Sequence, residues 1–342
     1  MTLIYIHNPA SIPWQMNLFD LVMLAIFVMA AVYSVVQFRR GRRIYAVLML
    51  TAFIYGLGLE LGGMATHNSY TQGTFTVMLN WPALQLFHHS TQMPSYVPIF
   101  YPVVLFIGFK VLEALGIQSR WRAAITGDLI MVAIDAPYII EGGLRHIVWW
   151  TWHDWRMYQL WLGWPLVDLW WQATWDALFF YVMLRALPAL NADAGDAARW
   201  PNIKALVGFP LLASTVLLLV GPVLHLPLAA VTYLGGPQWP LVIVLVVAYA
   251  AVTVAALRRA RPLGIEEITV AVVSVYAVGF AAMIIANVVY EHAVTLYIAV
   301  QNLGLLVLCG FVAFPVLARN AEAAPQNSDS DATVGSVSRL RS

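Results

Sequence analysis

Charged residues are scarce in this chain. Asp, Glu, Lys and Arg make up only 10% of its 342 residues, whereas hydrophobic residues make up 61% and the mean hydropathy is +0.76. A soluble protein carries about 25% charged residues, so this chain has too few charges to cover a surface that faces water. The shortage excludes most soluble enzyme folds, argues against nucleic acid as a partner, and predicts an integral membrane protein.

Cysteine and the common catalytic motifs are also nearly absent. The single cysteine, Cys309, excludes an intrachain disulfide. The sequence contains no Gly-x-x-x-x-Gly-Lys phosphate loop, no His-Glu-x-x-His zinc helix, no Gly-x-Ser-x-Gly elbow and no aspartate-rich diphosphate motif. We therefore expect a function that uses no nucleotide and no other cofactor.

Long apolar runs are what the sequence has in abundance. A helix needs about 20 apolar residues to cross about 30 Å of hydrocarbon. Nine runs meet this length: 17–38, 44–64, 96–115, 123–141, 162–184, 203–222, 238–257, 267–289 and 295–317. The sequence therefore predicts an all-α, polytopic transmembrane helix bundle.

The domain organisation follows from the polar stretches. Residues 1–318 are predicted to form one transmembrane domain, with halves at about 1–185 and 201–318 joined by a polar linker. Residues 319–342 are small and polar and lack aromatic side chains, so we expect a disordered tail in the cytoplasm.

Basic residues predict the orientation of the bundle. We assign 16 of the 18 Lys and Arg, Lys110 and Lys204 among them, to the connections that follow odd-numbered spans, starting with the cluster Arg39, Arg40, Arg42 and Arg43; only Arg145 and Arg156 fall on the other side. Cytoplasmic loops are rich in Lys and Arg. We therefore expect the N-terminus outside and the C-terminus in the cytoplasm of a bacterial or archaeal cell membrane.

All eight histidines lie on the predicted outer side. Five are in the loops at about 65–95 and 142–161: His67, His88, His89, His146 and His153. Imidazole suits zinc or iron, but the spacing matches no known metal box, so we favour no metal. The tryptophans of the second loop, at 149, 150, 152 and 155, are interpreted first as anchors at the membrane interface and second as a lid over the bundle.

Acidic residues inside the spans carry the most information. They are Glu60 on span two, Asp128 and Asp135 on one face of span four, and Asp168 and Asp176 on span five, with Gln172 between them. A charged side chain at mid-bilayer costs about 2.5–3.5 kcal/mol. Such residues either form hydrogen bonds between helices or line a polar cavity, where a neutral carboxylic acid can donate a proton. For Glu60, Asp135 and Asp168 together we favour the cavity.

Glycines surround Glu60, at positions 56, 58, 62 and 63. Glycine in a membrane helix allows either close packing of helices or room for a ligand beside the backbone. Close packing is the commoner explanation.

The order of several motifs resembles a known family. These motifs are Glu60-Leu-Gly-Gly63 followed by Thr66 and Tyr70, then Asp128 and Asp135, then Trp150-Thr-Trp152, and finally Gly163-Trp-Pro165-Leu-Val-Asp168-Leu-Trp170. The pattern is similar to that of the membrane-embedded carotenoid hydratases of the bacterioruberin type and of related carotenoid cyclases. It covers roughly residues 50–180. Asp168 stands where that family usually has Asn, and histidines occupy an outer loop where it has glycine and tyrosine.

The resemblance implies acid catalysis on an alkene of a long isoprenoid. A carboxylic acid would protonate the double bond, and water or an internal alkene would capture the carbocation. Glu60 or Asp135 would be the proton donor, and the other, with Asp168, would orient water or act as base. The residues that would bind the substrate are Thr66, Tyr70, Asp128, Trp150, Trp152, Trp170 and Gln172. The partners implied are the lipid bilayer and a hydrophobic isoprenoid-like substrate.

Three other functions remain open from the sequence. In a proton-coupled transporter the buried acids would form a proton relay, although the two halves show no repeat. In a metal-dependent lipid enzyme the outer histidines would hold the metal. A non-catalytic membrane partner is the third, without positive support, and no protein partner is indicated.

Overall fold

The computed structural model describes residues 3–66, 70–80, 92–144, 149–191, 200–290 and 295–323. Within these residues, nine helices or helical runs are long and apolar enough to cross a membrane. This confirms the predicted all-α polytopic bundle. The spans lie close to the predicted ranges, and the orientation of the termini remains a prediction.

Seven of the spans are single helices. They are α1 (Trp14–Arg39), α2 (Ile44–Thr66), α3 (Val97–Leu115), α4 (Arg120–Gly142), α9 (Trp239–Leu257), α10 (Glu267–Tyr290) and α11 (Thr295–Ala323). Helix α11 runs past the predicted domain boundary at 318 to Ala323, and residues 324–342 lie outside the described residues. Residues 319–323, which the sequence assigned to the tail, are therefore helical.

The fifth and sixth spans are interrupted. Span five consists of α5 (Leu166–Trp171), the π-helical segment η3 (Gln172–Asp176) and α6 (Ala177–Leu190). Span six consists of the π-helical segment η4 (Lys204–Gly208), α7 (Phe209–Leu224) and α8 (Leu226–Tyr233), with a break at His225. Proline at positions 222 and 227 on either side of the break removes backbone donors and explains why the helix does not continue.

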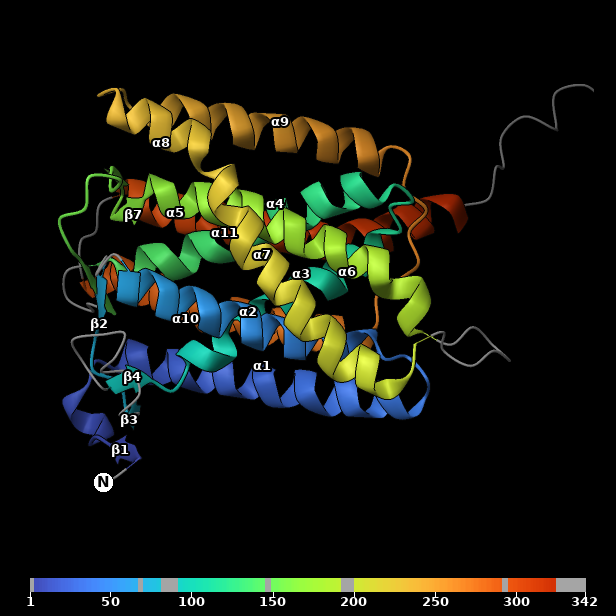
Figure 1. The fold of residues 1–342 in the computed structure, drawn as a ribbon, viewed down its shortest axis with the longest axis horizontal. Coiled ribbons are helices and arrows are strands. Elements are labelled where there is room, and N and C mark those ends of the chain that lie inside the picture. Colours follow the sequence, from blue (N-terminus) through green and yellow to red (C-terminus); the bar gives the residue numbers. More distant parts are fainter. Residues whose placement is uncertain are drawn as a thin grey trace, which may run out of the picture.

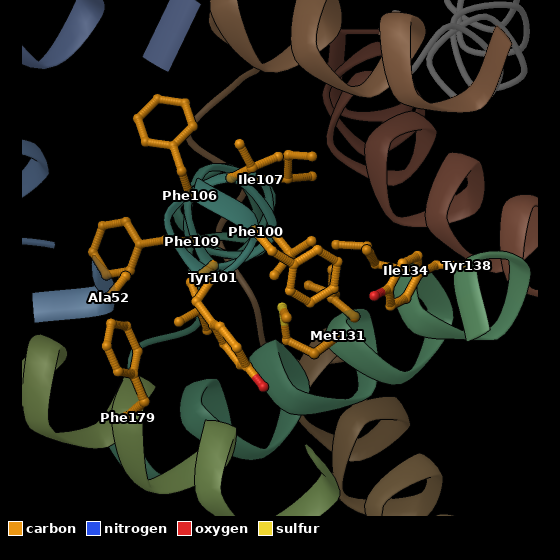
Figure 2. Close-up of a cluster of buried hydrophobic side chains, with 14 of the residues drawn as sticks. Ala52, Phe100, Tyr101, Phe106, Ile107, Phe109, Met131, Ile134, Tyr138 and Phe179 are labelled. Atoms are coloured by element: carbon orange, nitrogen blue, oxygen red, sulfur yellow. The ribbon is translucent and has the colours of Figure 1, made fainter. Parts of the chain in front are cut away.

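Helix α3 is the centre of the bundle. All its residues except Ile99 and Glu113 are buried. Figure 2 shows α3 end-on. Phe106 and Phe109 lie on one side of this helix, and Met131 and Ile134 of α4 lie on the other. A helix that is hydrophobic all round requires neighbours on every side, and α3 packs against α1, α2, α4, α10 and α11.

Short strands lie together at one end of the bundle, which we call the strand end (Figure 1). β1 (Ile4–Ile6), β3 (Val77–Asn80) and β4 (Gln92–Pro94) form an antiparallel sheet in the order β1-β3-β4. β2 (Tyr70–Gln72) pairs with β5 (Trp150–Trp152), and β6 (Leu160–Trp161) pairs with β7 (Trp164–Pro165). A 3-10 turn, η1 (Pro9–Ser11), precedes α1.

The opposite end, which we call the basic end, gathers the connections rich in arginine. Arg43 Nη1 donates to the Trp200 carbonyl at 2.7 Å, and the Arg261 amide donates to the Gly116 carbonyl at 3.2 Å. Gly116 has φ +65°, and a Cβ there would lie 1.9 Å from the Arg261 carbonyl oxygen. The connections that follow spans one, three, five and seven therefore share one end, as the charge pattern predicts.

Candidate functional site

A cavity of about 640 Å³ opens at the strand end of the bundle. Its walls come from α2, β2, the start of α3, α4, the segment 150–158, span five and span six. Among its lining residues are four of the predicted site residues with polar or charged side chains: Glu60, Tyr70, Asp168 and Gln172. The cavity thus brings together residues more than 100 positions apart in the sequence.

Glu60 is held by strand β2. The Tyr70 hydroxyl donates a hydrogen bond to Glu60 Oε2, and the Gln72 side chain lies beside the same carboxyl group. Tyr70 and Gln72 are two positions apart on a strand and so share a face. The Tyr96 hydroxyl in turn donates to Gln72 Oε1 at 2.7 Å. Burial and the Glu60 charge raise the pKa of Tyr70 well above its usual value, so Tyr70 remains a donor at neutral pH.

Asp168 faces the same cavity from the first turn of α5. Its Oδ2 accepts a hydrogen bond from the Trp164 indole nitrogen at 2.9 Å. Glu60 lies close enough for the two carboxyl groups to interact electrostatically. Both half-buried carboxyls therefore accept hydrogen bonds from neutral groups, and no ion pair to either is found among the described residues.

The glycines of α2 serve both purposes that the sequence suggests. A Cβ on Gly56 would lie 2.2 Å from the Tyr101 ring, and one on Gly58 would lie 2.6 Å from Leu218, so both allow close packing. A Cβ on Gly62 would meet nothing within 4 Å. Gly62 therefore leaves space in the cavity wall beside Glu60.

The tryptophans at 150, 152 and 155 line the cavity. Trp149 is fully buried against Phe19, with ring centroids 4.3 Å apart. Pairing of β5 with β2 places this run over the end of the bundle. Trp149 and Trp150 are therefore buried in the protein, and the position of the run at a membrane interface remains a prediction. Trp14 and Trp239, which are about half exposed, fit an interface position better.

Two helix interruptions meet at the cavity wall. A Cβ on Gly221 of α7 would lie 2.2 Å from the Trp175 ring, so the indole of η3 packs directly on the α7 backbone. Trp170 Nε1 donates to the Leu224 carbonyl at 2.9 Å, next to the break at His225. π-Helical turns often occur at functional sites, and non-helical backbone at membrane depth occurs where it is buried in protein or lines a cavity.

His225 is a cavity residue that the sequence reasoning did not select. Its ring packs on Trp175, with centroids 5.5 Å apart, and lies near the backbone of Val167 and Gly221. The signal that could have found it is the pattern Pro222-Val-Leu-His225-Leu-Pro227, in which two prolines bracket a histidine inside an apolar span.

Three further acids lie deeper than the cavity. Asp128, Asp135 and Asp176 are each at most 2% exposed and do not line the cavity. The Tyr55 hydroxyl donates to Asp176 Oδ1 at 3.4 Å, and Asp128 faces the amide of Ala177. Neither Asp128 nor Asp135 has a side-chain hydrogen bond of normal geometry among the described residues. Asp176 is close enough to both for electrostatic interaction.

The remaining predicted residues occupy other positions. Trp170 is buried beside the cavity and does not line it. Thr66 lies at the end of α2, and its side chain lies outside what the structure describes. Glu141, a further buried acid near the end of α4, accepts hydrogen bonds from Asn287 Nδ2 at 2.5 Å and Gln301 Nε2 at 2.9 Å, and these bonds join α4 to α10 and α11.

The metal alternative rests mainly on residues that the structure does not describe. His67, His88, His89 and His146 lie outside the described residues, and His153 Nε2 lies 3.4 Å from Thr71 Oγ1. In the part of the chain that is described, no three His, Cys, Asp or Glu side chains group in a way that could hold a metal ion.

A second polar cluster lies at the basic end and was not expected from the sequence. Lys110 of α3 is 2% exposed, and its Nζ lies 2.6 Å from Glu113 Oε2 and 3.3 Å from Glu266 Oε1. Arg42 pairs with the same two glutamates at 2.9 and 3.4 Å. Tyr33 donates to Glu266, and Tyr45 donates to Glu113. We call these six residues the ionic cluster.

No protein-family model, no curated protein and no solved structure matches this chain. The site must therefore be interpreted from its own chemistry. It combines two carboxyl groups held by neutral donors, walls of aromatic rings, and a position inside a membrane bundle. Such a site can transfer protons in a water-poor space and stabilise a positive charge on the faces of aromatic rings.

Proposed function

We propose that this chain is an integral-membrane enzyme that protonates an alkene of an isoprenoid-like lipid, with hydration or cyclisation as the outcome. The observation that carries the proposal is the pairing of Glu60 and Asp168 in one aromatic cavity. One carboxyl group would give its proton to a carbon of the double bond. The other would orient water or take a proton back from the resulting carbocation.

The aromatic walls support the carbocation step. Trp152, Trp171 and Tyr101 line the cavity together with the two carboxyls, and a cation within about 6 Å of such a ring is stabilised by its electron-rich face. Apolar walls also favour a hydrocarbon chain over a water-soluble substrate. The proposal needs no metal and no nucleotide.

The test is lipid profiling by mass spectrometry in a host that makes acyclic isoprenoids, with and without this chain. We expect a product heavier by one water, or an isomer with altered retention, that disappears in Glu60→Gln and Asp168→Asn. Asp154→Asn, on an exposed loop, serves as the matched control. An unchanged profile with well-inserted protein would count against the proposal.

A proton-coupled transporter is a second candidate, because one observation favours it. Two interrupted spans meet at the cavity, as in transporters whose binding sites lie between broken helices. Asp176, Asp128 and Asp135 would then continue a proton path from the cavity into the bundle. Flux into proteoliposomes driven by a pH gradient, and lost in Asp176→Asn, would favour this candidate over the enzyme.

A further inference from the structure

Helix α8 forms part of one wall of the cavity. Ala229 and Tyr233 of α8 line the cavity, together with Leu218 and Pro222 of α7. Figure 1 shows α7 crossing the bundle obliquely and α8 turning from it toward the strand end. The change of direction falls at His225, between two prolines. Helix α8 has only eight residues and begins at a break that is flanked by prolines. It therefore forms a part of the cavity wall that is separate from α7.

Helix α8 is held weakly by packing. Only Leu228 and Thr232 among its residues are buried. Leu226 is 62% exposed and Leu234, just beyond the helix, is 88% exposed. Apolar side chains exposed within a transmembrane span face lipid. Moving these side chains within the bilayer costs little free energy, because lipid chains are as apolar as the protein groups that they would contact instead.

Polar contacts fasten the far end of α8 to the segment 156–159. Arg156 Nη2 donates to the Tyr233 carbonyl at 3.2 Å, and its guanidinium lies 5.0 Å from the Tyr233 ring centroid. Gln159 Nε2 donates to the Gly236 carbonyl at 3.1 Å, and Gln159 Oε1 accepts from the Gln238 amide at 2.8 Å. Gln238 Nε2 donates to the Met157 carbonyl at 2.8 Å. We call Arg156, Gln159 and Gln238 the latch.

Both sides of the latch border the cavity. Met157 and Tyr158 line it on one side, and Tyr233 lines it on the other. Breaking the latch and bending at His225 would therefore open the cavity sideways, into the bilayer. The carboxyl groups at Glu60 and Asp168 would be reached from that opening.

We propose that the cavity takes its ligand laterally from the bilayer, through the wall between α8 and the segment 156–159, with the latch closing behind it. The ligand class is therefore a membrane-dissolved lipid with an extended apolar chain, and not a water-borne solute. This inference rests on the proposed function only in taking the cavity as the substrate site. It does not depend on the reaction that occurs there.

The experiment measures access to the cavity without turnover. A Cys309→Ser background carries one reporter cysteine, Gly62→Cys, at a position on the cavity wall where a Cβ meets nothing within 4 Å. Val167→Cys, on the α5 wall, is a second reporter in case the first variant fails to fold. The protein is reconstituted in nanodiscs, which expose both faces of the bilayer. A long-chain maleimide dissolved in the lipid is then compared with a charged maleimide in water.

We expect the lipid-dissolved reagent to label the reporter faster than the charged one. Gln159→Leu and Arg156→Ala should raise the lipid-phase rate by about fivefold or more and leave the aqueous rate unchanged. Gln118→Leu and Arg258→Ala, at the basic end, are the matched controls and should change neither rate. Faster labelling from water, or a lipid-phase rate that does not respond to the latch variants, would overturn lateral access. Because labelling needs no turnover, a failed lipid-profiling test leaves this result interpretable.

Discussion

At the basic end of the bundle, Lys110 and Arg42 are paired with Glu113 and Glu266, whereas at the strand end Glu60 and Asp168 accept hydrogen bonds from neutral donors and have no ion pair among the described residues. Both ends place acids among apolar helices. At the basic end every charge of the ionic cluster has an opposite charge within 4 Å. Paired charges stabilise one arrangement of helices, while carboxyls without a cation remain able to gain and lose protons.

The titration of the ionic cluster fits a structural role. Burial alone would raise the pKa of Glu266, but a hydrogen bond from Tyr33 and the charges of Lys110 and Arg42 lower it below its usual value. Burial would lower the pKa of Arg42, but nearby Tyr45 and Glu113 raise it. Both shifts favour the charged forms. The cluster therefore joins α1, α2, α3 and the start of α10 as fixed charges.

The largest expected effect is a difference in turnover between variants of the cavity acids and variants of the deeper acids. Glu60→Gln and Asp168→Asn should each lower turnover by about 100-fold or more, because removing a general acid or base costs 10²–10⁴-fold. Asp135→Asn should cost much less, because Asp135 lies behind the cavity wall. Product formation per milligram of folded protein is the measurement. Turnover that survives Glu60→Gln but disappears in Asp135→Asn would reverse this assignment.

The next effect concerns the ionic cluster. Lys110→Met should lower the free energy of unfolding by about 3 kcal/mol, the lower end of the range for breaking a buried pair, because both glutamates are partly exposed. Thermal unfolding in detergent measures the change, with Arg258→Met as an exposed control. If Lys110→Met unfolds like the wild type, the cluster is not a structural tie.

A matched pair of glycines tests how tightly the cavity wall is packed. Gly221→Ala should destabilise the protein by about 1–3 kcal/mol, because the new methyl group would overlap the Trp175 ring. Gly62→Ala should leave stability nearly unchanged, because its methyl group points into open space. Equal unfolding temperatures for the two variants would show that η3 and α7 do not pack as described.

The smallest effect is a dependence on pH at the basic end. The pKa of Glu266 is lowered in the folded protein, so its contribution to stability is present above its unfolded pKa of about 4.5 and is lost as the pH falls through the folded value. The difference in unfolding temperature between wild type and Glu266→Gln should therefore shrink below about pH 4.5. A difference that grows on acidification would contradict the sign of this shift.

The spans could be predicted from the sequence because a membrane imposes one length and one composition on each of them. The strands could not. β2 and β5 contain only three residues each, too few to show a period of two, and their pairing joins Tyr70 to Trp152 across a long stretch of chain. The interruptions in spans five and six are equally local, and only the prolines around His225 gave a signal in the sequence.

About half of the candidate site could be predicted from the sequence. Unpaired acids inside apolar runs identified Glu60 and Asp168, because such residues are costly unless they face a cavity. The depth of Asp135 could not be inferred, since a shared helix face does not say which neighbour covers it. Lys110 was assigned to a basic loop, because its partners Glu113 and Glu266 come from different helices and meet only in the folded bundle.

The most direct measurement of the central claim is turnover in D₂O, with the product analysed by mass spectrometry. Protonation of an alkene by Glu60 or Asp168 would place one deuterium on carbon, where later washing in H₂O cannot remove it. We predict a product that carries one such deuterium and that is absent in both Glu60→Gln and Asp168→Asn. A product without carbon-bound deuterium would contradict proton transfer as the step that this cavity performs.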